Sequence, residues 1–216
     1  MSSDPLGDVP SAGAERPSPP GSELSLATLV RARGTALLEA LERHRPGSGD
    51  HAAGTASFAF ALAAELGYER DRAEAIRETA RLHDVGLVYV PAPVLAKPAA
   101  ELAAGDRALL AASLGKGAGL ARGAGVPEEA CAWLAASGER FDGRGPGGLA
   151  GERIPREARL IRAACACDAA LSGPMPAGGA AGARERAIDE LRRAAGAELD
   201  PDVTAALVAL LGRIVT

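Results

Sequence analysis

Apolar residues recur at helical spacing along most of the chain, and breaks rich in glycine and proline separate the segments. The first helical segment begins near Ser22 and ends at the break RPGSGD (45–50). Two further helices are predicted over about 51–66 and 70–84, each ended by a glycine. The apolar stripe of the first segment consists of Leu26, Val30, Leu37 and Leu41.

The second half of the sequence continues the helical pattern with longer breaks. Residues 87–95 are apolar but carry two prolines, so we predict an extended loop rather than a strand. Proline followed by Glu128 and Glu129 is a favourable helix start, because acidic side chains there face the helix dipole. The remaining predicted segments are helices over 99–121, 127–138 and 155–172, Gly/Pro loops at 141–155 and 173–182, and two final helices, the last opening at Asp200-Pro201.

The composition agrees with closely packed helices. Hydrophobic residues make up 47% of the chain but aromatic residues only 3%, whereas strands favour aromatic and β-branched side chains. We therefore predict an all-α fold with one domain over 23–216. Residues 1–22 are rich in Pro, Ser, Gly and Asp without a hydrophobic period, which predicts a disordered N-terminal tail.

Charge and cysteine content exclude several classes of protein. The 24 basic and 28 acidic residues are well mixed, so neither a nucleic-acid partner nor a membrane surface is expected. The N-terminus lacks the features of a signal peptide, and no apolar run has the length to cross a bilayer. Cys131, Cys165 and Cys167 are odd in number and lie in helical segments, which indicates reduced thiols and a cytoplasmic location.

Histidines occupy positions on the apolar faces of the second and third predicted helices. If these helices form an antiparallel hairpin, His51 and His83 face each other with Asp84 adjacent. Two imidazoles and a carboxylate that converge make a divalent-metal site. The alternative is a buried hydrogen-bond network without metal. The two stripes are His51, Phe58, Leu62 and Leu66, and Ala73, Ile76, Ala80 and His83.

Several motifs resemble the HD-GYP family, within the HD superfamily of metal-dependent phosphohydrolases. The resemblance covers about residues 37–212, and His51 precedes His83 by 32 positions as in that family. It implies a helical bundle of about seven to eight helices. Active members hold two or three iron or manganese ions and hydrolyse cyclic di-GMP or related dinucleotides. The matching segments are HAAGTASFAFALAAELG (51–67), LHDVG (82–86), VPAPVLAKP (90–98), ERFDGRG (139–145), LAGERIP (149–155), ARLI (158–161), DAALS (168–172) and LDP (199–201).

The chain departs from this pattern at most of the positions to which the resemblance assigns metal binding. The pattern implies His-Pro where Ser113-Leu114 stand, His-His where Ser137-Gly138 stand, and Asp where Cys165 stands. The chain has only three histidines, whereas the family site uses five. Other departures are Leu87 in place of a lysine, Gly145-Pro146 without the tyrosine, and GPMPAGG (173–179) in place of a basic segment that grips phosphates.

A single-metal site is what the remaining residues allow. His51, His83 and Asp84 are its candidate ligands, and Cys165 could supply a thiolate in place of the missing aspartate. Asp168 lies one turn later and could substitute directly or through water. The competing interpretation of Cys165 is a small buried helix residue, and this interpretation is favoured for all three cysteines, Cys131 and Cys167 included.

Two other motifs receive structural interpretations. His44, at the predicted end of the first helix, is interpreted as a C-terminal histidine stabilised by the helix dipole. GRGPGG (143–148) matches a dinucleotide fingerprint, but it follows no strand and opens no helix, so it predicts no phosphate site.

The preferred functional hypothesis is a degenerate HD-GYP-type signalling domain that does not hydrolyse cyclic di-GMP and acts as a binding or scaffold module. The alternative is a mononuclear phosphohydrolase that uses His51, His83 and Asp84. The expected cofactor is either none or a single divalent ion (Zn, Fe or Mn). The expected partner is a bacterial signalling protein or a cyclic dinucleotide.

Overall fold

The computed structural model describes residues 24–176 and 178–213, in which all regular elements are helical. The all-α prediction is confirmed for this part of the chain, while the predicted tail at 1–22 lies outside it. Three short 3-10 helices accompany the α-helices: η1 (Val85–Tyr89), η2 (Ala99–Glu101) and η3 (Gly151–Arg153). The α-helices are α1 (Leu26–His44), α2 (Ser48–Glu65), α3 (Arg70–Ala80), α4 (Ala92–Leu95), α5 (Ala104–Gly123), α6 (Glu128–Ala136), α7 (Arg156–Leu171), α8 (Gly179–Ala194) and α9 (Pro201–Arg213).

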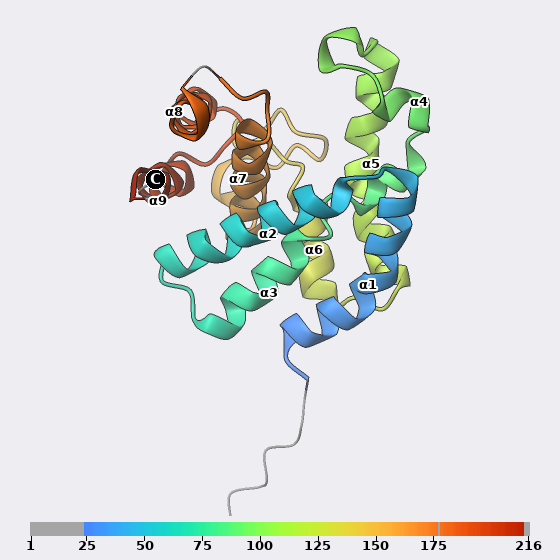
Figure 1. Cartoon of the computed structure of the whole chain (residues 1–216). Helices are drawn as coiled ribbons and strands as arrows, with labels where there is room; N and C mark the ends of the chain where they lie inside the picture. The colour runs from blue at the N-terminus through green and yellow to red at the C-terminus, as the bar shows by residue number, and fades with distance from the viewer. Residues whose placement is uncertain (1–23, 177, 214–216) are drawn as a thin grey trace, which may run out of the picture.

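An antiparallel hairpin of α2 and α3 lies at the centre of the fold (Figure 1). Helix α7 crosses α2 and packs closely against it, while α1 packs against α3. On one side, α5 contacts η1 and α6; on the other, α8 and α9 pack against α7 and each other. The N-terminal turn of α2, the segment after α3 and the middle of α7 thereby meet.

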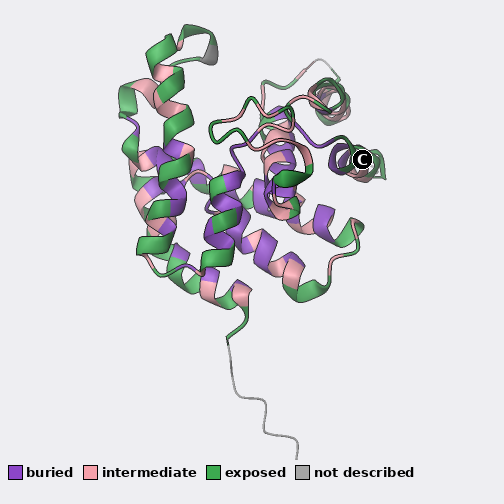
Figure 2. Cartoon of the chain, turned by 180° about the vertical axis from the view of Figure 1, so that it is seen from behind, coloured by how far each residue is buried: buried purple, intermediate pink, exposed green. Residues whose placement is uncertain are grey.

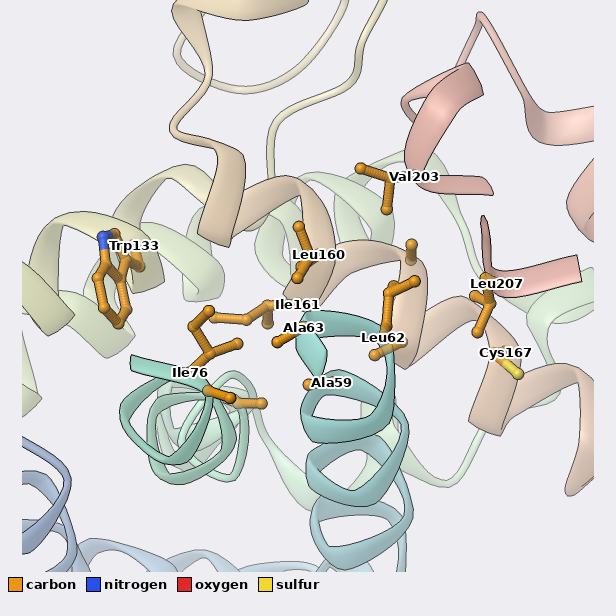
Figure 3. Close-up of a cluster of buried hydrophobic side chains, with 14 of the residues drawn as sticks. Ala59, Leu62, Ala63, Ile76, Trp133, Leu160, Ile161, Cys167, Val203 and Leu207 are labelled. Atoms are coloured by element: carbon orange, nitrogen blue, oxygen red, sulfur yellow. The ribbon is translucent and has the colours of Figure 1, made fainter. Parts of the chain in front are cut away.

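Small residues let these helices pack closely around a compact hydrophobic core. Buried residues are on the inward helix faces (Figure 2), and alanines alternate with a few larger side chains. The largest cluster joins α2, α3, α7 and α9, and includes Leu62, Ile76 and Leu160 (Figure 3). Cys167 lies in this cluster and Cys131 in a second one around Val30 and Leu82, so the core interpretation of both cysteines is confirmed.

The third helix ends earlier than predicted. It stops at Ala80, and four-residue turns follow in which the amides of Leu82 and His83 donate to the carbonyls of Thr79 and Ala80. The predicted extended loop at 87–95 is also wrong. The segment forms η1 and the one-turn α4, because prolines at the first positions of a helix cost no hydrogen bond.

Two helix starts differ from the predictions. Helix α2 begins at Ser48 rather than 51, because the Glu42 carboxylate accepts hydrogen bonds from the amides of Gly47 and Gly49, each at 2.8 Å. These amides have no partner within the helix. Helix α8 begins at Gly179, inside the predicted loop at 173–182.

Replacing Glu42 by glutamine should therefore weaken the start of α2 in a pH-dependent way. The amide hydrogen bonds lower the pKa of Glu42 from its ordinary 4.5. A carboxylate with a lowered folded-state pKa stabilises the protein above its unfolded pKa and loses that effect as the pH falls through the folded value. We expect Glu42→Gln to lower the melting temperature at pH 7 by about 1–3 °C.

The difference should shrink as the pH falls below 4.5, the ordinary pKa of the group. Thermal melts across this range provide the measurement. Glu39→Gln, at an exposed position of the same helix, serves as the control and should behave as wild type. A pH-independent effect of Glu42→Gln would contradict the assigned role of the carboxylate.

Within the described ranges, no helix combines the length and apolar character needed to cross a membrane.

Candidate metal centre

Two histidines and a cysteine from three separate helical segments converge at the centre of the fold. His51 comes from the first turn of α2, His83 from the turn after α3, and Cys165 from the middle of α7. The Nε2 atoms of the histidines lie 3.2 Å apart, and the Cys165 Sγ lies 3.7 Å from His51 Nε2. Among the described residues, these three are the group of His, Cys, Asp or Glu side chains whose ligand atoms could hold a metal ion.

Hydrogen bonds on the outer nitrogens orient both imidazoles. His51 Nδ1 donates to Asp168 Oδ2 at 2.6 Å, and His83 Nδ1 donates to the Ala80 carbonyl at 2.8 Å. Because a carboxylate and a carbonyl only accept, both Nδ1 atoms carry protons. The two Nε2 atoms then point toward each other, so a positive charge, either a proton or a metal ion, has to lie between them. This outer-shell arrangement is typical of metal-ligating histidines.

The distances between these atoms fit one tetrahedral ion. Ordinary Zn–N and Zn–S bond lengths place two nitrogen ligands about 3.3 Å apart and a nitrogen and a sulfur about 3.6 Å apart. The corresponding distances in this structure are 3.2 Å between the Nε2 atoms and 3.7 Å between His51 Nε2 and Cys165 Sγ. No large rearrangement is therefore needed for these three side chains to bind one ion.

Asp84 and Asp168 have different relations to the cluster. The Asp84 carboxylate approaches the inner nitrogens, with Oδ1 at 3.5 Å from His83 Nε2 and Oδ2 at 3.9 Å from His51 Nε2. Its Oδ2 also lies 3.8 Å from the guanidinium of Arg45. Asp168 instead contacts the outer nitrogen of His51. Asp84 thus lies on the same side as the inner nitrogens, whereas Asp168 lies behind the ring of His51.

The electrostatics of the cluster favour a thiolate beside a charged imidazole. Burial opposes ionisation of Cys165, but the positive charge of His83 and hydrogen bonds from both histidines outweigh it and lower the pKa of the thiol to about 6. The other two cysteines behave differently. Burial raises the pKa of Cys131, and it raises the pKa of Cys167 to about 12. Cys165 therefore has an environment distinct from theirs.

The positions to which the family pattern assigns further histidines hold no metal-binding side chain, and two of them, Leu114 and Ser137, line the cavity beside the cluster. The hydroxyls of Ser113 and Ser137 donate to the carbonyls of Leu110 and Leu134 in their own helices, at 2.7 and 2.9 Å. A Cβ added to Gly138 would lie 2.9 Å from Leu114 Cδ1, so a side chain at this position requires the leucine to shift. Leu87 belongs to an apolar cluster with Leu41 and Val90.

Two contacts could not be inferred from the sequence. Gly54 lies one turn after His51 in α2, and a Cβ there would lie 1.8 Å from Asp168 Oδ1. The glycine therefore allows α7 to bring Asp168 to His51. In the sequence, a glycine inside a predicted helix is the one sign of such a close approach. His44 ends α1 as expected, but its Nε2 also donates to the Val90 carbonyl at 2.7 Å, which ties α1 to the segment after η1.

A cavity of about 280 Å³ adjoins the cluster. His83, Asp84 and Cys165 form part of its wall, and its other lining residues include Leu114, Ile161 and Arg162. The Arg162 guanidinium is directed to Glu198, with a nitrogen–oxygen distance of 3.4 Å between the side chains. The glycine-rich loop around Gly147 lies elsewhere and donates an amide to the buried Glu139 carboxylate, which agrees with a structural role for GRGPGG.

Comparisons with known proteins agree with this architecture. A family model described as "HD domain" matches residues 35–203. By structure, the chain is similar to Bd1817, an HDG"Y"P protein from Bdellovibrio bacteriovorus, with a TM-score of 0.64 and 20% identity over 87% of this chain. It is also similar to the cyclic GMP-AMP specific phosphodiesterase V-cGAP3 of V. cholerae, with a TM-score of 0.63 and 19% identity over 88% of this chain.

A third similar structure is the HD domain of the L. monocytogenes phosphodiesterase PgpH in complex with cyclic-di-AMP, with a TM-score of 0.59 and 17% identity. The match covers 83% of this chain and 96% of the PgpH domain. By contrast, it covers 61% of the Bdellovibrio chain and 49% of the V. cholerae chain. No curated protein matches the sequence. At these identities the structural similarity establishes the fold alone.

Proposed function

The chain belongs to the HD domain family, and we propose that it is a signalling module that holds one divalent metal ion and binds its ligand or partner without hydrolysing cyclic dinucleotides. The single observation that carries this proposal is the combination of one three-ligand cluster with the lack of metal-binding side chains at the positions where the family pattern has further histidines. The ligand atoms of His51, His83 and Cys165 lie close enough to hold one ion, whereas Ser113-Leu114 and Ser137-Gly138 offer no imidazole for a second one.

The donor set favours zinc over the harder metals. Two imidazoles and a thiolate are ligands that Zn²⁺ prefers, and Asp84 is the nearest carboxylate that can complete a tetrahedral shell. A divalent ion there would supply a fixed positive charge to the adjoining cavity. A shell with four protein ligands is typical of a structural or regulatory site, whereas a catalytic site keeps one position open.

The cavity also supports a non-hydrolytic function. A cyclic dinucleotide carries two phosphodiester charges, and active relatives of the kind the sequence resembles use several metal ions to offset such charge. Here the cavity offers the guanidinium of Arg162, which is already directed to Glu198. The sequence GPMPAGG (173–179) contains no basic residue that could offset the phosphate charges.

Metal content is the direct test. Protein purified without an affinity tag and without chelators should contain about one equivalent of zinc per chain, measured by plasma mass spectrometry, because the three ligand atoms already lie within 4.8 Å of one another. His51→Ala should remove it. His44→Ala is the matched control, since His44 lies outside the cluster and bonds the Val90 carbonyl. Two or more equivalents of metal would contradict the mononuclear centre.

The second arm measures hydrolysis. The zinc-loaded protein should release no linear dinucleotide from cyclic di-GMP, cyclic-di-AMP or cyclic GMP-AMP above the rate of the His51→Ala variant. Binding of the same nucleotides is followed separately by calorimetry. Turnover that is lost in His51→Ala would overturn the non-hydrolytic assignment.

A second candidate is a mononuclear phosphohydrolase for a smaller phosphate ester. The observation that favours it is the cavity of about 280 Å³ that opens directly onto His83, Asp84 and Cys165. A small monoester needs less charge compensation than a cyclic dinucleotide. Release of inorganic phosphate from a broad panel of phosphomonoesters, dependent on metal and on His83, would support this candidate, and an inert panel would exclude it.

A further inference from the structure

Among the described residues, Arg162 in the wall of the cavity beside the cluster has only distant partners for its charge. Its Nη2 donates to Glu198 Oε2 at 3.4 Å, and its Nε donates to the backbone carbonyl of the same residue at 3.3 Å. Charge-assisted hydrogen bonds between nitrogen and oxygen are usually about 2.7–2.9 Å long. The guanidinium therefore keeps most of its capacity to bind an anion.

The Glu198 carboxylate is held more closely by another arginine. Its Oε1 lies 2.9 Å from Arg140 Nη1. Arg140 in turn donates to both carboxylate oxygens of Asp142, at 3.1 and 2.8 Å. Glu198 can therefore stay with Arg140 while the guanidinium of Arg162 turns to a ligand in the cavity.

The size and the other walls of the cavity limit what can accompany the anionic group. Leu114, Ile161 and Leu199 give the cavity apolar walls, and its volume is about 280 Å³. Since an apolar cavity of about 150 Å³ accepts benzene, this one has room for roughly ten non-hydrogen atoms. Apolar walls with one cation suit a molecule with an apolar body and a single negative charge. A wholly hydrophilic anion would lose its hydration without gaining apolar contacts.

We propose that the cavity binds a small aliphatic carboxylate, whose head group pairs with Arg162 and whose chain lies against Ile161 and Leu199. The planar fork of a guanidinium matches a carboxylate in two parallel hydrogen bonds. One guanidinium offsets the single charge of such a ligand, whereas a cyclic dinucleotide carries two charges. The inference rests on the proposed function, because it names the class of ligand that the same module binds.

The experiment is calorimetric titration of the full-length protein, as purified and at pH 7, with sodium octanoate as the probe. We expect one binding site with a Kd below about 1 mM, an ordinary affinity for a ligand of this size. Octan-1-ol has the same chain without the charge and should bind at least about tenfold more weakly. Inorganic phosphate, which has the charge without the chain, should give no binding heat over the same concentrations.

Two variants that break the same ion pair separate binding from structure. Arg162→Gln should weaken octanoate binding by about 10–100-fold, because hydrogen bonds to a charged group are lost. Glu198→Gln should strengthen it by about threefold or more, because a neighbouring negative charge is removed. A merely structural role of the pair would make both variants weaker binders. Arg193→Gln is the control and should bind as wild type, since Arg193 is exposed on α8 and bonds the Asp189 carbonyl.

Three outcomes would overturn the proposal: no octanoate binding up to about 10 mM, equal affinities for octanoate and octan-1-ol, or wild-type affinity in Arg162→Gln. The last would place the carboxylate elsewhere, for example on a metal ion. Zinc content is measured on the same samples, so the two proposals fail separately. Protein with one zinc ion and no octanoate site would keep the metal centre and exclude this ligand. Octanoate binding through Arg162 in protein without zinc would exclude the metal centre and keep the ligand.

Discussion

Gly86→Ala is expected to destabilise the protein by about 3 kcal/mol or more, because no space exists for a methyl group where η1 crosses α5. A Cβ on Gly86 would lie 1.9 Å from the carbonyl oxygen of Ser113 and 2.9 Å from the amide nitrogen of Gly117. Both are backbone atoms of α5, so the contact cannot be relieved by a change of rotamer. The helix or η1 has to move, and His83 and Asp84 directly precede η1.

Chemical denaturation measures this effect as a lower midpoint at unchanged slope. Gly115→Ala is the matched control. Gly115 is on the exposed face of α5, the helix that Gly86 contacts, and a Cβ there meets nothing within 4 Å. Alanine is favoured over glycine within a helix, so this variant should gain about 0.5–1 kcal/mol. A wild-type midpoint for Gly86→Ala would mean that η1 does not pack against α5 as described.

The helices were predictable because local patterns determine them. Apolar periodicity located α1, α2, α6, α7 and α9 to within a few residues, and glycines and prolines marked their ends. The errors are at positions where contacts outside the helix itself decide the backbone. Helix α2 extends to Ser48 because Glu42 bonds to its first amides. The segment 87–95 is helical because η1 packs against α5, which is not adjacent in sequence.

In the candidate site, too, local patterns predict some residues and long-range contacts determine the others. The approach of His51 to His83 follows from two apolar stripes and a short turn, which are properties of a single hairpin. The orientation of Cys165 and Asp168 depends on how α7 crosses α2, and this crossing brings together residues more than a hundred positions apart. The sequence therefore indicated both residues only as candidates. It could not distinguish a residue that faces the cluster from one that supports a histidine from behind.

A methyl group on Gly54 tests this supporting role without changing His51, His83 or Cys165. In Gly54→Ala, the new Cβ would lie 1.8 Å from Asp168 Oδ1 and 2.6 Å from its Cγ. Asp168 must then leave its position, and His51 loses the hydrogen bond that holds its ring. Loss of such an outer-shell partner typically lowers metal affinity by about 10–100-fold. We expect a decrease of that size in zinc affinity, measured by competition with a chromophoric chelator.

The double variant Gly54→Ala/Asp168→Ala separates this cause from general disruption. If both changes act through the bond between Asp168 and His51, the double variant should bind zinc no more weakly than Asp168→Ala alone, because coupled effects do not add. Additive losses would show that Gly54 acts elsewhere. Gly119→Ala, where a Cβ meets nothing within 4 Å, controls for the glycine-to-alanine change itself. Since alanine also favours the helix, we expect Gly54→Ala to keep its melting temperature while its zinc affinity falls. A general structural defect would lower both.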